Sequence, residues 1–107
     1  MKFLTRQEEL ILISIYRFGG VSSLVKIREF VNKNTGKDWS ISSVYVPLDR
    51  LMRAGYLETS VGEPEARRGG KAVKYYKLTD EGLEALVEVK SVHDVMWKGI
   101  KKLALGR

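Results

Sequence analysis

Apolar residues recur at helical spacing in three segments of the first half of the chain, residues 5–20, 22–36 and 40–55. A serine or threonine that can act as an N-cap opens each segment. Glycine closes each one, as it does where a helix ends in the left-handed conformation. The pattern predicts three short helices, with Trp39 as a core anchor before the third.

The first predicted helix is apolar on more than one side. It begins with a capping box, in which the Thr5 oxygen accepts from a first-turn amide and Glu8 reaches back to the cap. Its main stripe consists of Glu8, Ile11, Leu12, Ile15 and Phe18. Leu10 and Ile13 lie off that stripe, so the sequence predicts burial of this helix against a second subunit as well as its own core.

The third predicted helix has two different faces. Its period turns one face toward the core: Ile41, Val44, Tyr45, Leu48, Leu51 and Met52. The other face carries Ser42, Ser43, Val46, Pro47, Arg50 and Arg53. Pro47 removes one amide donor and crowds the carbonyl of Ser43, so either the helix kinks there or it begins later than Ser40. Tyr45 is expected to face the core with its hydroxyl at the edge.

The pattern then changes to the period of two that is typical of strands. Residues 56–63 alternate, and residues 73–78 are rich in β-branched and aromatic side chains. Residues 64–71 between them combine proline and glycine with Arg67, Arg68 and Lys71. These segments predict a β-hairpin with a basic tip, and Val21 is expected to pair briefly as another strand.

A long helix is predicted over residues 80–105, acidic in its first turn as the helix dipole favours. One apolar row has spacings of four and three and consists of Ala85, Val89, Val92, Met96, Gly99 and Leu103. A parallel row consists of Leu86, His93 and Ile100. This is more apolar surface than a small domain needs, which predicts a dimer contact.

The order of three helices, basic hairpin and long helix predicts a mixed α/β (α+β) fold, the winged helix-turn-helix. In this architecture the third helix enters the major groove of DNA and the hairpin follows the backbone. We expect residues 1–79 to form the DNA-binding domain and residues 80–107 a C-terminal dimerisation helix in the same compact unit.

Composition agrees with one small globular domain that has an anionic partner. The 107 residues are 44% hydrophobic and 30% charged, and 19 Lys and Arg exceed 13 Asp and Glu, for a formal charge of +6. Cysteine is absent, which excludes disulfides and thiolate metal sites. The first residues carry charge too early for a signal peptide, and residues 10–13 are too short an apolar run to span a bilayer, so we expect a cytoplasmic protein.

Several motifs in this order resemble the PadR family of regulators. One is Tyr45-x-x-Leu48-x-Arg50-Leu51 within residues 38–51, and another is Arg67-Arg68-Gly69-Gly70 followed by Tyr75-Tyr76-x-Leu78-Thr79-x-x-Gly82. The resemblance runs from about Leu4 to Leu86 and is to the short-chain branch of the family. It implies a homodimeric transcriptional repressor whose C-terminal helix exchanges contacts with its partner. It also implies a small aromatic effector bound at the dimer interface.

Three sets of candidate site residues follow. For double-stranded DNA they are Ser42, Ser43, Tyr45, Val46, Pro47, Arg50, Arg53, Arg67, Arg68, Lys71 and Lys74. For the dimer interface they are Leu10, Ile13, Leu86, Val89, Val92, His93, Met96, Ile100 and Leu103. For an aromatic effector they are Trp97 and His93. The alternatives are a solvated helix face and loop tip for the charged residues, and interface packing for Trp97 and His93.

Nothing in the sequence indicates an enzyme. The chain has a single histidine, no cysteine, and no nucleophile motif between a strand and a helix. Gly69-Gly70 lacks the spacing of a phosphate loop, so we expect no cofactor. One histidine and scattered carboxylates do not form a ligand set, so we expect no metal. One alternative function is a winged helix that docks an acidic protein through its basic hairpin. Another is a sensor in which the release of DNA by an effector is the main activity.

Overall fold

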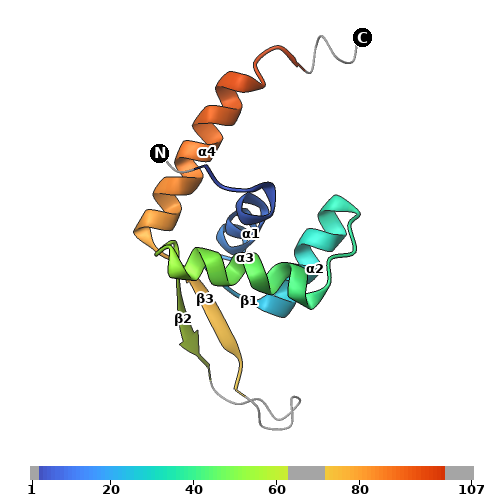
Figure 1. The fold of residues 1–107 in the computed structure, drawn as a ribbon, viewed down its shortest axis with the longest axis vertical. Coiled ribbons are helices and arrows are strands. Elements are labelled where there is room, and N and C mark those ends of the chain that lie inside the picture. The colour runs from blue at the N-terminus through green and yellow to red at the C-terminus, as the bar shows by residue number, and fades with distance from the viewer. Residues whose placement is uncertain (1–2, 63–71, 101–107) are drawn as a thin grey trace.

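A computed structural model describes residues 3–62 and 72–100 of the chain (Figure 1). It contains four helices and a three-stranded sheet in these residues, and so confirms the predicted α+β class. In chain order the elements are α1 (Arg6–Arg17), β1 (Val21–Ser23), α2 (Leu24–Thr35), α3 (Ile41–Arg53), β2 (Leu57–Val61), β3 (Lys74–Leu78) and α4 (Asp80–Met96).

Side-chain caps fix where the helices begin. The Thr5–Glu8 capping box at α1 is present with both of its hydrogen bonds. The hydroxyls of Ser23, Ser40 and Thr79 accept from first-turn amides of α2, α3 and α4. The structure therefore confirms the predicted starts of the helices, because each helix begins at a predicted cap whose side chain is hydrogen-bonded to the first turn.

The core lies between the first three helices and the inner face of the sheet. Each helix contributes residues spaced three or four apart, and the two hairpin strands contribute one residue each. The fully enclosed members are Ile11, Leu12, Ile15, Ile27, Val31, Val44, Leu48, Leu51, Leu57 and Tyr76. Trp39 is half-buried and packs against this cluster, as predicted.

The sheet has the strand order β1–β3–β2, and both pairings are antiparallel. Leu57 pairs with Leu78 at the base of the β2–β3 hairpin, and Val61 pairs with Lys74 at its outer end. The short strand β1 pairs with β3, so the predicted pairing of Val21 is confirmed. The hairpin leaves the helical body at one end, and α4 leaves it at the other (Figure 1).

Two residues of α3 do not occupy the core as the sequence pattern predicts. Ile41 is 53% exposed and Tyr45 is 46% exposed. The buried face consists of Val44, Pro47, Leu48 and Leu51, so the helix is rotated toward Pro47 relative to the prediction. A helical period gives the spacing of a buried face, whereas packing against α1 and α2 selects which residues it contains.

The last helix is shorter than the predicted span of residues 80–105. It ends at Met96 with Trp97 as its C-cap, and Gly99 has a left-handed φ of 78°. A glycine tolerates this conformation at little cost, so the chain leaves the helical path there and the apolar spacing does not continue it. Residues 101–105 of the prediction lie outside the described residues.

Gly82 allows α4 to approach the hairpin closely. A Cβ at this position would overlap the carbonyl oxygen of Tyr56 and lie 2.8 Å from Leu78 Cδ1. The same carbonyl accepts from the Thr79 amide at 3.2 Å, and the Thr79 hydroxyl donates to Gly55 O at 2.7 Å. The start of α4 is thereby fixed against the turn that joins α3 to β2.

Candidate nucleic-acid interface

The outward face of α3 carries small polar and apolar side chains that are free to meet a ligand. Ser42, Ser43 and Val46 are exposed, and Val46 has 49% of its surface accessible. The first turn is held by Ser40, whose hydroxyl accepts from the Ser43 amide at 3.1 Å and lies 3.0 Å from the Ser43 hydroxyl. Short side chains on one face leave room for a base pair edge to approach the helix.

Pro47 does not share this outward face. It is buried on the inner side of α3, and the helix continues through it from Ile41 to Arg53. The structure therefore favours a supporting role, and Pro47 is not among the residues that we propose to contact DNA. Tyr45 is instead exposed, so its ring as well as its hydroxyl is available at the surface.

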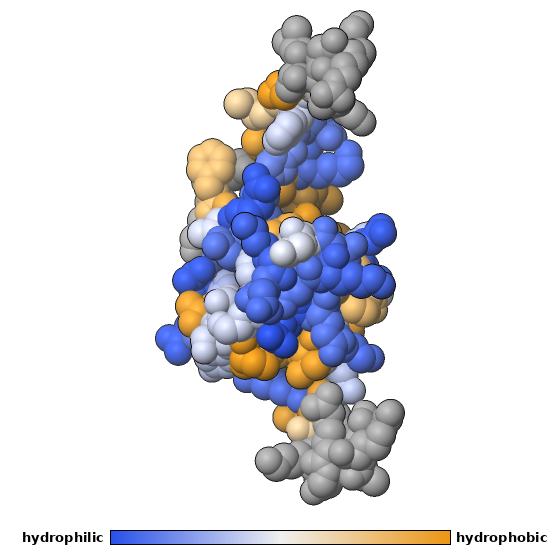
Figure 2. All heavy atoms as spheres, turned by 90° about the vertical axis from the view of Figure 1, so that its right-hand side faces the viewer, coloured by the Kyte–Doolittle hydropathy of each residue, from blue (hydrophilic) through white to orange (hydrophobic). Residues whose placement is uncertain are grey.

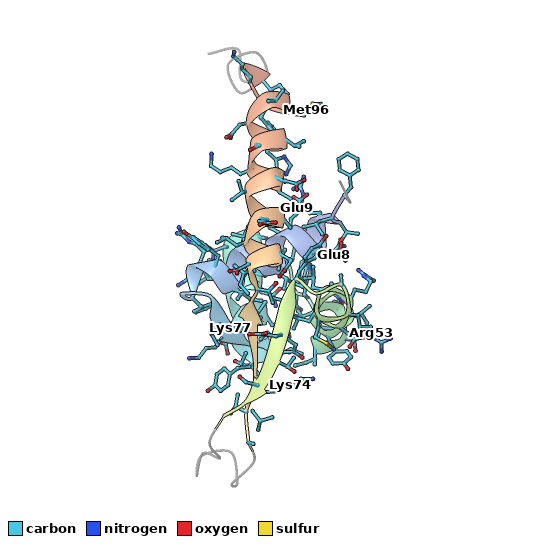
Figure 3. All side chains as sticks on the ribbon, turned by 90° about the vertical axis from the view of Figure 1, so that its left-hand side faces the viewer. Glu8, Glu9, Arg53, Lys74, Lys77 and Met96 are labelled. Carbon is cyan, nitrogen blue, oxygen red and sulfur yellow. The ribbon has the colours of Figure 1, made fainter. Side chains whose placement is uncertain are left out.

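The two arginines of α3 are held by different carboxylates. Arg50 Nε donates to Glu8 Oε2 of α1 at 3.3 Å, and Arg53 Nε lies 2.9 Å from Asp49 Oδ2 one turn earlier. Their side chains remain 51% and 76% exposed. Arg53 projects from the outer side of α3 (Figure 3). Each pair uses only the Nε donor, so the terminal nitrogens of both guanidinium groups remain available to an anion.

The turn before α3 is fixed by α2. The Trp39 amide donates to Asn32 Oδ1 at 2.8 Å, and the Trp39 carbonyl accepts from Arg28 Nε at 2.6 Å and Asn32 Nδ2 at 3.3 Å. These bonds immediately precede the Ser40 cap. They set the position of the N-terminal end of α3 relative to the core.

A shallow groove of about 480 Å³ lies between the start of α1 and α3, and it reaches from the exposed side chains of α3 to the buried Pro47. Its lining residues are Gln7, Trp39, Ser42, Ser43, Val46, Pro47 and Arg50. The sequence prediction did not include Gln7, Glu8, Arg28 or Asn32 in this site. Glu8 was assigned to the capping box and to the core-facing stripe of α1, and nothing in the local pattern of α1 or α2 connects these four residues to α3.

The β3 strand of the hairpin carries two lysines. Lys74 lies toward its outer end and Lys77 nearer the helices (Figure 3), in register with Val61 and Glu58 respectively. The Lys74 ammonium lies 5.5 Å from the centre of the Tyr76 ring, a cation–π distance. The candidate residues Arg67, Arg68 and Lys71 lie outside the described residues.

A second surface joins α1 to α4. An apolar groove of about 520 Å³ is lined by Ile13, Tyr16, Leu83, Leu86, Val87, Val89, Lys90 and His93. His93 Nε2 lies 3.0 Å from Glu9 Oε1 and bridges the two helices. Glu8 and Glu9 are neighbours that face different elements, Glu8 toward α3 and Glu9 toward α4 (Figure 3).

The groove brings together four of the predicted dimer residues, Ile13, Leu86, Val89 and His93. Leu86 and Val89 are turned partly into their own subunit, and Leu10 is half-buried. Val92, Met96 and Ile100 are exposed beyond the groove, and Leu103 lies outside the described residues. Tyr16, Leu83 and Val87 were missed, although Leu83 and Val87 have the spacing of four that marks a helical row.

Of the two predicted effector residues, only His93 lines the groove. Trp97 lies one turn further on at the end of α4 and is 57% exposed. Apolar atoms are visible among polar ones on the part of α4 that projects from the body (Figure 2). The two side chains therefore lie one turn apart near the C-terminal end of α4, and only His93 enters the groove.

Comparison with known proteins decides the family. The model of the transcriptional regulator PadR-like family matches residues 24–88, more than half of the chain. The chain belongs to this family. Its members are transcriptional regulators and not enzymes, which confirms the predicted class and the absence of catalysis. A search of curated proteins found no match.

Solved structures share the fold of this PadR-like chain. The protein smu.1704 from Streptococcus mutans UA159 is 28% identical with a TM-score of 0.74, over 100% of this chain and 96% of that one. A PadR family transcription regulator from Clostridium difficile R20291 is 22% identical with a TM-score of 0.69, and the match covers 92% of this chain and 94% of that one. F93 from STIV, a winged-helix DNA-binding protein, is 19% identical with a TM-score of 0.67, and the match covers 87% of this chain and 92% of that one. The last two matches show the fold.

The family and the fold together make this chain a PadR-like transcriptional regulator with a winged-helix fold. In residues 3–62 and 72–100 no helix is long and apolar enough to cross a membrane. The same residues contain no cluster of potential metal ligands.

Proposed function

We propose that this PadR-like regulator is a homodimeric repressor that reads double-stranded DNA with α3 and holds the DNA backbone with the β2–β3 hairpin. The observation that carries the proposal is the outward face of α3, where Ser42, Ser43 and Val46 are exposed beside Arg50. Arginine can contact guanine through two donors, and serine hydroxyls can bond bases or phosphates. Arg53, Tyr45 and Lys74 extend the contact to the backbone, with Arg67, Arg68 and Lys71 from the hairpin.

A second copy of this chain is the occupant that we propose for the α1–α4 groove. Among the 17 residues of α4, only Gly82 and Val89 are buried in a single subunit. Val87, Val95 and Met96 are each at least 60% exposed on the same helix. A soluble monomer rarely leaves so many apolar side chains exposed on one helix, and a twofold contact would cover part of this surface with an identical one. Residues 1–79 then form the DNA-binding domain and residues 80–107 the dimerisation segment.

The twofold arrangement predicts the form of the operator. Two copies of α3 related by the dimer axis would read a near-palindrome with half-sites about 34 Å apart, one turn of DNA. Most of the affinity would come from phosphate contacts, so binding should weaken steeply as salt rises.

Selection from random duplexes tests this function directly. Bound duplexes are recovered by gel shift, sequenced, and assayed again at several salt concentrations. We expect an inverted repeat, two chains per duplex, and reduced transcription in vitro when the repeat overlaps a promoter. Failure to shift any duplex at low salt would contradict DNA binding and favour the docking of an acidic protein. Increased transcription would contradict the role as a repressor.

A planar aromatic ligand at the subunit interface is the release signal that we propose. The support is the position of His93 in the apolar groove and of Trp97 one turn further along α4. A flat ring could stack on Trp97 within the dimer. Titration of the protein–operator complex with phenolic acids should quench tryptophan fluorescence and release DNA over the same range. The variant Trp97→Phe retains Trp39 and should lose the quenching; quenching that persists would contradict this site.

A further inference from the structure

Glu8 uses its two carboxylate oxygens for two different parts of the fold. Oε1 accepts from the Thr5 amide at 2.8 Å and completes the capping box of α1. Oε2 accepts from Arg50 Nε at 3.3 Å, across 42 positions of sequence, and joins α1 to α3. The Glu8 side chain is only 11% exposed, so its orientation is restricted by the surrounding protein.

This pair restricts how Arg50 can present its charge. Arginine has five N–H donors, and the contact to Glu8 uses the one on Nε. The four donors on the two terminal nitrogens stay available, and these form the fork that binds guanine O6 and N7. A free arginine side chain would lose rotamer entropy when it is fixed on a base. Part of that loss has already occurred in the free protein, because Glu8 holds the side chain.

The same carboxylate opposes DNA binding in general. A negative charge beside the recognition helix repels phosphates, and this repulsion acts on every sequence alike. Holding Arg50, in contrast, favours only those sequences that present a guanine to it. Glu8 therefore lowers affinity for all DNA while it raises discrimination between sequences.

We infer that Glu8 is a positioning residue for base recognition by Arg50, so that sequence discrimination in α3 depends on a carboxylate of α1. The inference rests on the proposed function and adds a determinant of specificity that does not touch DNA. This positioning role is separate from the structural role of Glu8 in the capping box, because the capping box uses Oε1 and Arg50 is bonded to Oε2.

The variant Glu8→Gln separates these roles. Glutamine has one acceptor oxygen, and it is acceptable at this capping-box position, so the bond from Thr5 can be kept while the contact to Arg50 is lost. Affinities are measured by gel shift for the duplex that the parent protein selects from a random pool and for a scrambled duplex. We expect affinity for the scrambled duplex to rise on the order of threefold, because one repulsive charge is gone. The ratio of the two affinities should fall about tenfold, the value of one guanine contact.

Two further variants identify the cause. In an Arg50→Ala background, Glu8→Gln should leave the ratio unchanged, because the residue through which it acts is absent. Thr5→Ala removes the cap hydroxyl but leaves Oε2 free to hold Arg50, so it should lower the midpoint of urea unfolding and not the ratio. If Glu8→Gln does not fold, Glu8→Asp serves in its place: it keeps the negative charge but is one methylene shorter and withdraws from Arg50, so it should lower the ratio without raising affinity for the scrambled duplex.

The outcomes are distinct. Equal changes in both affinities would overturn the inference and leave the proposed function intact. The inference would also be overturned if Glu8→Gln lowered the ratio of the two affinities in the Arg50→Ala background. A parent protein that shifts no duplex would overturn the proposed function and the inference with it.

Discussion

Asn32 hydrogen-bonds through its side chain to both backbone groups of Trp39. Its oxygen accepts from the Trp39 amide at 2.8 Å and its nitrogen donates to the carbonyl at 3.3 Å. The pair closes the loop between α2 and α3 at the residue before the Ser40 cap. Together with the bond from Arg28 Nε to the Trp39 carbonyl, this pair fixes the orientation in which the chain enters α3, as a helix that is proposed to read DNA requires.

Removing this amide should destabilise the domain. Asn32→Ala leaves the Trp39 amide without its acceptor in a half-buried position, so we expect the free energy of unfolding to fall by about 1–2 kcal/mol. Urea denaturation measures the change. The matched control is Asn34→Ala on the same helix, whose amide bonds only to Phe30 O at an exposed site. Similar losses in the two variants would contradict a special role of Asn32.

Replacing Gly82 with alanine should also destabilise the protein, although alanine has the higher helix propensity. Alanine favours a helix over glycine by about 1 kcal/mol. A Cβ at this position would overlap the Tyr56 carbonyl, which is backbone and cannot move aside readily. We expect the overlap to dominate and Gly82→Ala to lose about 1–3 kcal/mol in thermal unfolding. Glu84→Ala, at an exposed site of α4, should change stability by less than about 0.5 kcal/mol.

A charge in the α1–α4 groove should prevent dimerisation. Leu83 lines the groove and is 42% exposed in the single chain, so Leu83→Glu places a carboxylate in the proposed interface without burying it in the monomer. Sedimentation velocity should show a monomer with unchanged helix content. Glu88→Gln, exposed and outside the groove lining, should remain dimeric. A dimer that persists in Leu83→Glu would contradict this surface as the interface.

The basic segment 64–71, which the sequence predicts as the tip of the hairpin, should contribute affinity without specificity. Arg67→Ala and Arg68→Ala together should lower affinity for all duplexes and reduce the slope of log affinity against log salt by about two per subunit. Lys98→Ala is the control, because it removes a positive charge beyond the far end of α4 from the hairpin (Figure 1). An unchanged slope in the double variant would count against phosphate contact by the tip.

Val46 should read a thymine methyl group. An exposed aliphatic side chain in the major groove can contact the C5-methyl of thymine, and loss of one such contact is worth about 0.8 kcal/mol, or about fourfold in affinity. Replacing each thymine of the selected half-site in turn by deoxyuridine should reveal one position with this loss. Val46→Ala should be insensitive at that position and remain sensitive to the neighbouring bases. Equal sensitivity of both proteins would remove Val46 from base recognition.

The helix starts and the hairpin could be predicted from the sequence because they depend on neighbours in the chain. Thr5 and Glu8 are three residues apart, and Ser40 accepts from an amide three residues on. Motifs of this range carry their hydrogen bonds within one turn. The polar residues Ser42 and Ser43 were likewise assigned to the outward face of α3 by period alone, and they are exposed.

The rotation of α3 about its own axis was decided by tertiary packing. The apolar pattern placed Tyr45 inward and Pro47 outward, and the structure reverses both, because α1 and α2 enclose the side that contains Pro47. The left-handed backbone of Gly99 turns the chain off the helical path just after α4 ends at Met96. The apolar spacing would have continued the helix, because hydropathy does not report backbone conformation.

By itself, then, the sequence determined the elements, their order and the family, all of which depend on short-range spacing and on motifs. Only the tertiary structure joined Glu8 to Arg50 and Asn32 to Trp39, and gathered Ile13, Leu83 and Val87 into one groove. The physical reason is that these contacts connect different elements. Their partners are selected by how the helices pack, and no local periodicity along the chain contains that information.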